Sequence, residues 1–359
     1  MTNCKNVLMY MIGNGVFGNL PALLEEKRKD ESDYCILFVD DYFRESSILL
    51  PLKLNPRDRI VFVPTVHEPK TSYINAVYDE LVSSGLCSPC TIVGIGGGIT
   101  LDTAKAVANL LTNGGRAEQY QGWDLVNKPA IYKIGVPTIS GTGAESSRTC
   151  VMTNVTSGLK LGMNSNYTIY DQLVLDPQLT KTVPRDQYFY TGIDSYIHCF
   201  ESLEGRYRNV IGDAFSDQAI KLCRDVFLGN DMMNDDSREK LMIASYLGGC
   251  AIAHSFVGVV HPFSAGLSVV LGIHHGVGNC IVMRGMREFY PENYEEFWRM
   301  VRTQKVHIPE GVCDALTDED YRRLYEATII HEKPLSNALG DNYKNILTYE
   351  KVREIFKML

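Results

Sequence analysis

The sequence lacks long apolar runs and long basic runs, and each absence excludes a class of protein. No uninterrupted apolar stretch approaches the roughly 20 residues that a membrane-spanning helix needs. The longest basic cluster is Lys27-Arg28-Lys29, and the formal net charge of the 359 residues is −8. Because nucleic-acid binding relies on a basic surface, neither a membrane nor a nucleic acid is expected as a partner.

A disulfide framework and a secretion signal are also missing from the pattern. Ten cysteines are scattered along the chain, without the dense spacing of a disulfide-bonded domain. The first 18 residues form a short apolar stretch broken by Gly13 and Gly15, with no cleavage pattern behind it, which favours a first β-strand of the mature protein. We expect reduced thiols and a cytoplasmic protein.

One pair, Cys87-Ser-Pro-Cys90, has the spacing of a redox or metal pair. The sequence holds no second pair of this kind, and this one lies between a helix-compatible segment and a strand. An inert loop pair is the favoured interpretation, and a redox site is the alternative.

The first half of the chain alternates apolar, β-branched runs with helix-compatible segments, which is typical of a parallel sheet with crossover helices. Strands are expected at 35–41, 59–64, 91–98 and 132–138, and helices at 72–84 and 101–112. From Pro184 onward only helix-compatible stretches follow, at 186–202, 213–228, 237–256, 263–271 and 292–302. We therefore predict an α/β domain over 1–183 and an all-helical domain over 184–359.

Two glycine-containing loops follow predicted strands. The strand at 91–98 ends in Gly96-Gly97-Gly98 and leads into a helix, where backbone N–H groups and the helix N-terminus suit a pyrophosphate. This run is not the G-x-G-x-x-G fingerprint, and a tight turn with left-handed backbone would also use glycine. The second loop, Pro137–Glu145, offers the hydroxyls of Thr138, Ser140 and Thr142. Together the loops indicate a nucleotide site more strongly than either does alone.

Asp40, in the strand predicted at 35–41, has two interpretations. Its carboxylate suits the ribose hydroxyls of an adenosine, a role that would favour NAD over NADP. Asp40 and Asp41 would equally serve as caps of the next helix, and on local grounds capping is the favoured interpretation.

Asp194 and His198 stand at i and i+4, so one helix face presents a carboxylate beside an imidazole. Four of the eight histidines fall within 254–275, among them His261 and His275. Three imidazoles and one carboxylate suit iron(II), zinc or another mid-row divalent ion, and four protein ligands favour iron(II) over a catalytic zinc. The alternative is a set of ordinary core histidines and a helix-surface ion pair.

Several segments together carry a resemblance to a known family. They are GGGITLDTAKA (96–106), VPTISGTGAESSRT (136–149), VLDPQLTKTVP (174–184), GIDSYIHCFES (192–202), VVHPFSAGLS (259–268) and HHGVGN (274–279). In order and spacing they resemble the iron-containing alcohol dehydrogenase family. The resemblance implies a nucleotide-binding α/β domain and a helical metal domain, with the active site in the cleft between them.

Carried over position by position, the resemblance implies a ligand set and a dinucleotide site. The metal ligands that it implies are Asp194, His198, His261 and His275. It also implies that Gly97 and Gly98 contact the pyrophosphate, and that Asp40, Thr138, Thr142 and Lys160 help to hold NAD or NADP. The implied reaction is the oxidation of an alcohol, in which a divalent ion, Fe²⁺ or Zn²⁺, lowers the pKa of the alcohol and the nicotinamide accepts a hydride.

Two positions depart from the family pattern. The family usually has His-x-x-x-His after the third ligand, and Ala265 here replaces the second histidine, which is often credited with proton handling. His254, where the family commonly has Asn, is a candidate catalytic substitute. Ile99 replaces the serine after the glycine run, which removes one hydroxyl from the phosphate site but leaves its backbone donors.

Within the family, residues 122–149 resemble the branch that oxidises C8 of 3-deoxy-D-manno-octulosonate (Kdo), a step toward an 8-amino sugar of lipopolysaccharide. Members of that branch are described as oxidases, which leaves a nicotinamide or oxygen as the final acceptor. Arg148 is a candidate for binding the carboxylate of the sugar acid, and an ion pair with Glu145 is the alternative.

Other functions stay open. Dehydroquinate synthases and glycerol dehydrogenases share the architecture, but the former typically bind metal through a Glu and two histidines. A general NAD(P)-dependent dehydrogenase of primary alcohols or polyols is a further candidate. A metal- or nucleotide-binding sensor without turnover is another, which Ala265 keeps open. The expected partner is a small sugar acid or alcohol, and a homodimer is the expected assembly.

Overall fold

The structure is a computed structural model that describes residues 4–359, which form two compact units. The N-terminal unit comprises the chain up to Ile139 together with Ala144–Lys181. The C-terminal unit comprises Ser140–Gly143 together with Thr182–Leu359. The short segment 140–143 therefore belongs to the second unit, whereas the boundaries predicted at 1–183 and 184–359 assign it to the first.

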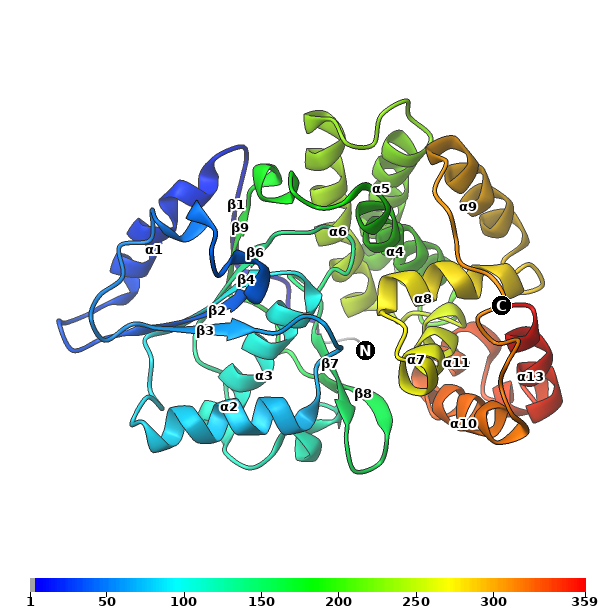
Figure 1. The fold of residues 1–359 in the computed structure, drawn as a ribbon, viewed down its shortest axis with the longest axis horizontal. Coiled ribbons are helices and arrows are strands. Elements are labelled where there is room, and N and C mark those ends of the chain that lie inside the picture. Colours follow the sequence, from blue (N-terminus) through cyan, green and yellow to red (C-terminus); the bar gives the residue numbers. More distant parts are fainter. Residues whose placement is uncertain (1–3) are drawn as a thin grey trace. The chain divides into compact units, whose positions relative to one another are not determined.

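A six-stranded parallel sheet forms the centre of the N-terminal unit, in the order β1-β9-β6-β4-β2-β3 (Figure 1). Its strands are β1 Met9–Ile12, β2 Cys35–Asp40, β3 Arg59–Val63, β4 Thr91–Gly96, β6 Lys133–Pro137 and β9 Gln172–Leu175. The predicted parallel sheet is confirmed, because central strands buried on both faces carry the continuous apolar runs seen in the sequence.

Helices cover both faces of this sheet. They are α1 Leu20–Lys27, α2 Thr71–Ser83 and α3 Gly98–Asn113. Leu37 and Val39 of β2 share an apolar cluster with α1, whereas Ile36 and Phe38 share one with α2 and α3. Figure 1 shows α1 on one side of the sheet and α2 with α3 on the other. The alternation of side chains along β2 therefore assigns the two layers.

A small second sheet, with the strand order β5-β8-β7, was not predicted. Its strands are β5 Gly122–Trp123, β7 Thr149–Asn154 and β8 Leu159–Asn164. The antiparallel β7 and β8 are joined by a tight turn, in which Asn154 Oδ1 accepts the N–H groups of Thr156 and Ser157 and Gly158 has a φ of 70°. Short polar strands of this kind give a weak pattern in the sequence, which explains the omission.

The C-terminal unit is helical, as predicted. Its helices are α4 Arg185–Glu204, α5 Val210–Phe227, α6 Asp235–His254, α7 Val260–Leu271, α8 His275–Val282, α9 Pro291–Gln304, α10 Asp318–Ile329, α11 Glu332–Leu339, α12 Tyr343–Ile346 and α13 Tyr349–Lys357. Short 3₁₀ turns lie in both units. Those of the N-terminal unit are Val16–Asn19, Asp41–Phe43, Ser47–Leu49, Ala117–Tyr120 and Pro177–Thr180, and Met283–Gly285 belongs to the C-terminal unit.

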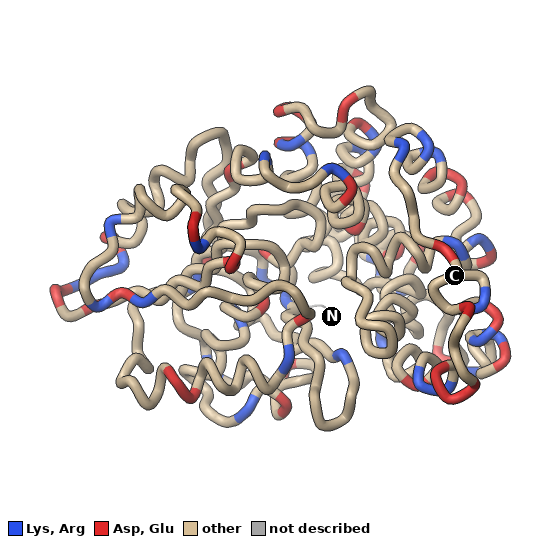
Figure 2. Tube along the Cα trace, viewed as in Figure 1, with Lys and Arg blue, Asp and Glu red and all other residues tan. Residues whose placement is uncertain are grey.

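One apolar cluster runs through the C-terminal unit, while acidic and basic residues line α9, α10 and α13 (Figure 2). No helix among residues 4–359 combines the length and apolar character required to span a bilayer. All ten cysteines are free thiols. Cys87 is exposed, and the thiol of Cys90 lies 3.6 Å from that of Cys35 on β2.

The packing of Gly94 on β4 gives a test of the N-terminal core. The hydroxyl of Tyr170 donates to the carbonyl of Leu101 at 2.9 Å, and a Cβ at Gly94 would collide with that hydroxyl. We expect Gly94→Ala to lower the free energy of unfolding by about 1–3 kcal/mol, because overpacking a core forces its neighbours to shift. Gly18→Ala, where a Cβ meets nothing within 4 Å, is the control. Equal urea midpoints for both variants would contradict the expectation.

Candidate functional site

Four side chains converge in the C-terminal unit: Asp194 and His198 of α4, His261 of α7 and His275 of α8. One potential ligand atom from each lies within 4.8 Å of the other three. Helix α8 packs against both α4 and α7, which brings these separate segments of the chain together. Asp194 and His198 share a helix face because they are four residues apart.

The three imidazoles present the same nitrogen to one carboxylate. Nε2 of His198 and of His261 lie 3.5 and 3.2 Å from Asp194 Oδ1. Nε2 of His275 lies 3.5 Å from Oδ2 of the same residue. The rings of His198 and His261 stack with centroids 4.6 Å apart. The nitrogens therefore point to a common centre beside a fully buried carboxylate.

The donor set of this cluster fits a divalent metal ion. Within residues 4–359, neither Asp194 Oδ2 nor His261 Nε2 has a hydrogen-bond partner, although both atoms are buried. Leaving a buried polar atom unsatisfied costs about 1–3 kcal/mol, so their persistence here indicates an absent partner. Imidazole nitrogen and carboxylate oxygen are borderline ligands that suit iron(II) or zinc.

The pKa values of these groups depend strongly on one another. Burial lowers the pKa of His198 to about 3, although Asp194 opposes this shift. Burial alone would also lower the pKa of His261, but the carboxylates of Glu201 and Asp194 outweigh it and raise this pKa to about 9. Burial would raise the pKa of Asp194, yet the imidazoles of His198 and His275 hold it well below its usual range. Asp194 is therefore ionised at neutral pH.

Behind the cluster lies a buried carboxylate, Glu201, that the sequence analysis missed. Its Oε2 is 2.5 Å from Nδ1 of His261, and its Oε1 accepts the N–H of Val260 at 2.6 Å. Because Nδ1 is engaged, Nε2 is the nitrogen of His261 that can bind a metal. The spacing contained a signal, since Glu201 follows His198 by three residues on the same face of α4.

Two further side chains missed by the sequence analysis support other ligands. Asn279 Nδ2 donates to Asp194 Oδ1 at 2.7 Å, and Ser264 Oγ lies 3.4 Å from Nδ1 of His275. Asn279 follows His275 by four residues on α8, and Ser264 follows His261 by three on α7. Each lies one helical turn from a ligand, which is the spacing that could have identified both.

In the N-terminal unit, the glycine run forms the turn between β4 and α3. Gly97 caps α3 with a φ of −81°, and none of Gly96, Gly97 and Gly98 has a positive φ, so the left-handed alternative is wrong. Close packing explains two of the glycines: a Cβ at Gly96 would lie 2.7 Å from Thr100 Cβ, and one at Gly97 would lie 2.9 Å from Ile139. The first N–H groups of α3 have no acceptor within the helix, which suits an anion.

Asp40 lies beside this turn, since a Cβ at Gly96 would be 3.0 Å from the Cβ of Asp40. Its carboxylate accepts the N–H of Tyr42 at 3.0 Å and the hydroxyl of Thr65 at 3.1 Å. The capping interpretation is therefore confirmed, because Asp40 caps the 3₁₀ turn Asp41–Phe43. Burial raises the pKa of Asp40.

The second predicted loop, 137–145, is divided between the two units. The N–H of Thr138 donates to the carbonyl of Gly96 at 3.1 Å, next to the glycine turn. Thr142 lies in the segment that belongs to the C-terminal unit. There the N–H groups of Gly141 and Gly143 donate to the hydroxyl of Ser245 at 2.8 and 3.2 Å.

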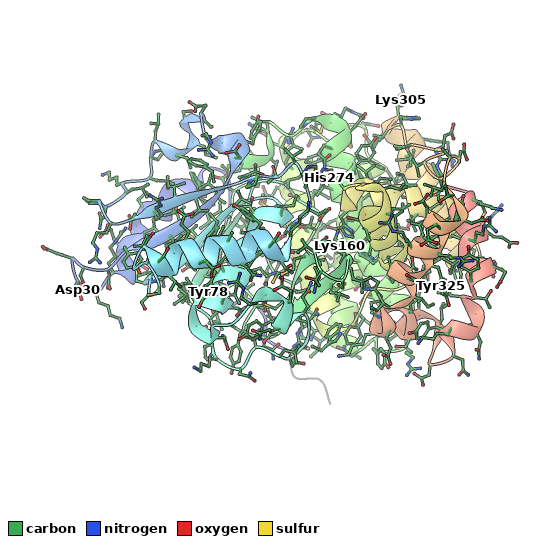
Figure 3. All side chains as sticks on the ribbon, turned by 60° about the horizontal axis from the view of Figure 1, so that its bottom comes forward. Asp30, Tyr78, Lys160, His274, Lys305 and Tyr325 are labelled. Atoms are coloured by element: carbon green, nitrogen blue, oxygen red, sulfur yellow. The ribbon has the colours of Figure 1, made fainter. Side chains whose placement is uncertain are left out.

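The remaining candidates are dispersed. Lys160, labelled in Figure 3, lies on β8 and forms an ion pair with Glu68 at 3.1 Å. Arg148 precedes β7 and forms an ion pair with Asp124, whereas the sequence analysis named Glu145 as its alternative partner. This ion pair does not exclude a ligand, because the side chain of Asp124 is 63% exposed and solvent screens the pair.

His254 ends α6 and contacts α5. Its carbonyl accepts from Asn209 Nδ2 at 2.8 Å, and its ring centroid lies 5.6 Å from that of Phe215. Burial lowers the pKa of His254. Position 265, where the family has a second histidine, holds a buried alanine four residues after His261 on α7. The helix face that carries the third ligand therefore offers no proton-transfer group at this position.

Comparison with known proteins assigns the family. The model described as "Iron-containing alcohol dehydrogenase" matches residues 9–177, and "Fe-containing alcohol dehydrogenase family, C-terminal" matches residues 188–323. The first model covers most of the α/β unit with its glycine turn, and the second covers the part of the helical unit that holds all four residues of the cluster. The chain belongs to the iron-containing alcohol dehydrogenase family.

Individual relatives are more distant. Sulfoacetaldehyde reductase of Bilophila wadsworthia is 35% identical over 214 residues, which is 58% of this chain and 54% of the relative. NAD-dependent methanol dehydrogenase of Bacillus methanolicus is 31% identical over 195 residues, 54% and 51% of the two chains. The chain thus spans about half the length of the curated relatives it matches. A solved sulfoacetaldehyde reductase of Bifidobacterium kashiwanohense, in complex with NAD⁺, has a TM-score of 0.78 at 18% identity and covers 99% and 98% of the chains, which shows a shared fold.

The two adjacent histidines at the start of α8 provide a matched test of the metal site. His274 is exposed and His275 belongs to the cluster. We expect His275→Ala to weaken binding of a divalent ion by more than about 100-fold, beyond the usual effect of an outer-sphere change. His274→Ala should leave affinity unchanged. Metal analysis by mass spectrometry after dialysis checks both variants, and equal retention would contradict the ligand set.

Proposed function

We propose that this protein is a metal-dependent alcohol dehydrogenase that uses a nicotinamide cofactor. The overall reaction is RCH₂OH + NAD(P)⁺ → RCHO + NAD(P)H + H⁺. The observation that carries the proposal is the convergence of three imidazole Nε2 atoms on the buried carboxylate of Asp194. This ligand set, Asp with three His, differs from the Glu with two His expected of a dehydroquinate synthase.

The metal ion would bind in the helical unit. Asp194, His198, His261 and His275 would hold Fe²⁺ or Zn²⁺, and the bound ion supplies Lewis acidity that lowers the pKa of an alcohol. Asn279 and Ser264 keep two of these ligands oriented through their hydrogen bonds. Four protein ligands together with a substrate oxygen would suit a five- or six-coordinate ion, which favours iron(II) over zinc.

The nicotinamide cofactor would bind through the N-terminal unit. Its pyrophosphate would meet Gly97 and Gly98 at the start of α3, where the buried hydroxyl of Thr100 has no hydrogen-bond partner among the described residues. Asp40, already beside this turn, would accept the ribose hydroxyls, and its negative charge would disfavour the extra phosphate of NADP. Thr138, Thr142 and Lys160 would complete the site. Two relatives support NAD: one is named NAD-dependent and another is in complex with NAD⁺.

His254 is proposed as the proton-handling group in place of the histidine absent at Ala265. We expect His254→Ala to lower kcat by about 100-fold at neutral pH, the effect typical of losing a general acid–base group. The pH–rate profile should lose one limb in the variant. Normal turnover across the whole pH range would remove His254 from the mechanism.

For the substrate, we propose the C8 primary alcohol of Kdo, oxidised to the aldehyde for 8-amino-sugar and lipopolysaccharide synthesis. The support is the resemblance of residues 122–149 to that branch, together with Arg148, whose guanidinium suits a carboxylate. The relative named sulfoacetaldehyde reductase also acts, by its name, on an anionic compound. A general primary alcohol is the alternative substrate.

Replacing Arg148 tests recognition of the anionic group. We expect Arg148→Met to raise KM for Kdo about 10-fold or more, with little change in kcat, because a lost charged hydrogen bond costs about 1.5–3 kcal/mol. Arg116→Met is the control. Arg116 also pairs with an aspartate, Asp79, but it lies outside residues 122–149, on which the resemblance to the Kdo branch rests. A KM that is unchanged by Arg148→Met would remove Arg148 from the substrate site.

The first experiment measures metal content and then turnover of Kdo with NAD, NADP or oxygen, with ethanol and sulfoacetaldehyde as comparison substrates. About one iron or zinc per chain with oxidation at C8 supports both the site and the substrate. Metal with turnover of other alcohols only would keep the activity and discard Kdo. Metal without any turnover would favour a sensor, and no metal would overturn the proposal.

A further inference from the structure

Glu201 is a buried ionisable group beside the four-ligand cluster, and the proposed mechanism gives it no role. Its side chain is completely buried, and its residue lies on α4 three positions after His198. A buried carboxylate is retained only where its oxygens are satisfied. Both are: Oε2 faces Nδ1 of His261, and Oε1 accepts the N–H of Val260 at 2.6 Å and lies 3.3 Å from the hydroxyl of Tyr290.

The backbone before and at the start of α7 packs closely against this carboxylate. The hydroxyl of Tyr290 also accepts the N–H of Val259 at 3.0 Å, so Glu201 and Tyr290 together engage the start of α7. A Cβ at Gly258 would lie 2.9 Å from Glu201 Oε1 and would collide with the hydroxyl of Tyr290. Glycine at 258 thus allows the chain to pass close to both groups. The same contacts fix the first turn of α7, which carries His261.

We infer that Glu201 is a positioning residue that selects the metal-binding tautomer of His261 and supplies the second negative charge of a divalent-ion site. This inference rests on the metal site of the proposed function. A carboxylate at Nδ1 requires a proton on that nitrogen, so the lone pair of the neutral ring lies on Nε2, facing Asp194. Glu201 is not one of the four ligands, because its carboxylate faces Nδ1 of His261 and not the common centre.

Charge neutrality gives a second reason for the carboxylate. As metal ligands the three imidazoles would be neutral, so the carboxylates of Asp194 and Glu201 would supply the two negative charges of the site. A divalent ion therefore makes the buried group neutral, whereas without Glu201 the same group would carry an uncompensated positive charge. Because burying a net charge is costly, Glu201 should strengthen binding of a divalent ion without contacting it.

Glu201→Gln is the informative substitution because it keeps the shape of the side chain. The amide oxygen can still accept from Val260 and Tyr290, which turns the NH₂ group toward Nδ1 of His261. That contact favours the tautomer with its proton on Nε2, which cannot bind a metal through the nitrogen that faces Asp194. We expect the Kd for Co²⁺, measured on the metal-stripped full-length chain by chelator competition, to rise about 10- to 100-fold.

Glu296→Gln is the matched control. Glu296 of α9 accepts from the hydroxyl of Tyr196 at 2.7 Å and pairs with Arg224, so its loss also removes a carboxylate from a tyrosine of the same unit. We expect the Kd for Co²⁺ to stay within about twofold of the unaltered chain, because its hydrogen bonds do not reach the ligands. The visible absorption bands of bound Co²⁺ report the ligand geometry, and only Glu201→Gln should change them.

Equal Co²⁺ affinity and an unchanged spectrum in Glu201→Gln would overturn the inference. So would an equal loss of affinity in Glu296→Gln, which would make the effect a general one of packing. If Glu201→Gln does not fold, Tyr290→Phe provides the test, since it removes one hydrogen bond to the carboxylate and should raise Kd about threefold or more. An unaltered chain that binds no Co²⁺ would instead overturn the proposed function.

Discussion

The burial of the Asp194 carboxylate is the constraint on which the C-terminal unit depends. A solitary carboxylate inside a helical core is strongly unfavourable, so the surrounding helices have to supply compensating partners. Helices α4, α7 and α8 each contribute an imidazole, and Asn279 donates a hydrogen bond. Helix α8 packs against both α4 and α7, and this packing brings those partners to one point. The donor set at that point suits a divalent cation.

The N-terminal unit is subject to a different constraint, the close packing of the turn between β4 and α3. Its glycines serve close packing, and the helix start beside them provides N–H donors. Asp40 has a local duty as a cap, which is compatible with a further acceptor role because a carboxylate has more than two acceptor positions. Lys160 likewise has a local partner in Glu68, and the three N–H donors of its ammonium group allow a further hydrogen bond.

Much of this organisation follows from the sequence, for identifiable reasons. The parallel sheet was predictable because fully buried strands read as apolar runs, and Asp194 with His198 because helical spacing is regular. The small sheet around Lys160 was not, since its strands are short and half polar. Glu201 was missed although it follows His198 by one helical turn, because that spacing indicates a shared helix face and does not reveal His261, the imidazole that the fold brings against it. Helices α8 and α10–α13 were missed because most of them are short.

The segment 140–143 makes the two halves inseparable by a single cut. The chain changes unit after Ile139, after Gly143 and again after Lys181, so the covalent order of the sequence does not match the two bodies that it builds. A fragment ending at Lys181 would carry Gly141, with a φ of 141°, without the α4 and α6 groups that hold it. The complementary fragment would expose the hydroxyls of Ser195 and Ser245. Exchange of such halves between related genes would therefore keep these hydrogen bonds only where both chains have this segment and the two serines that bond to it.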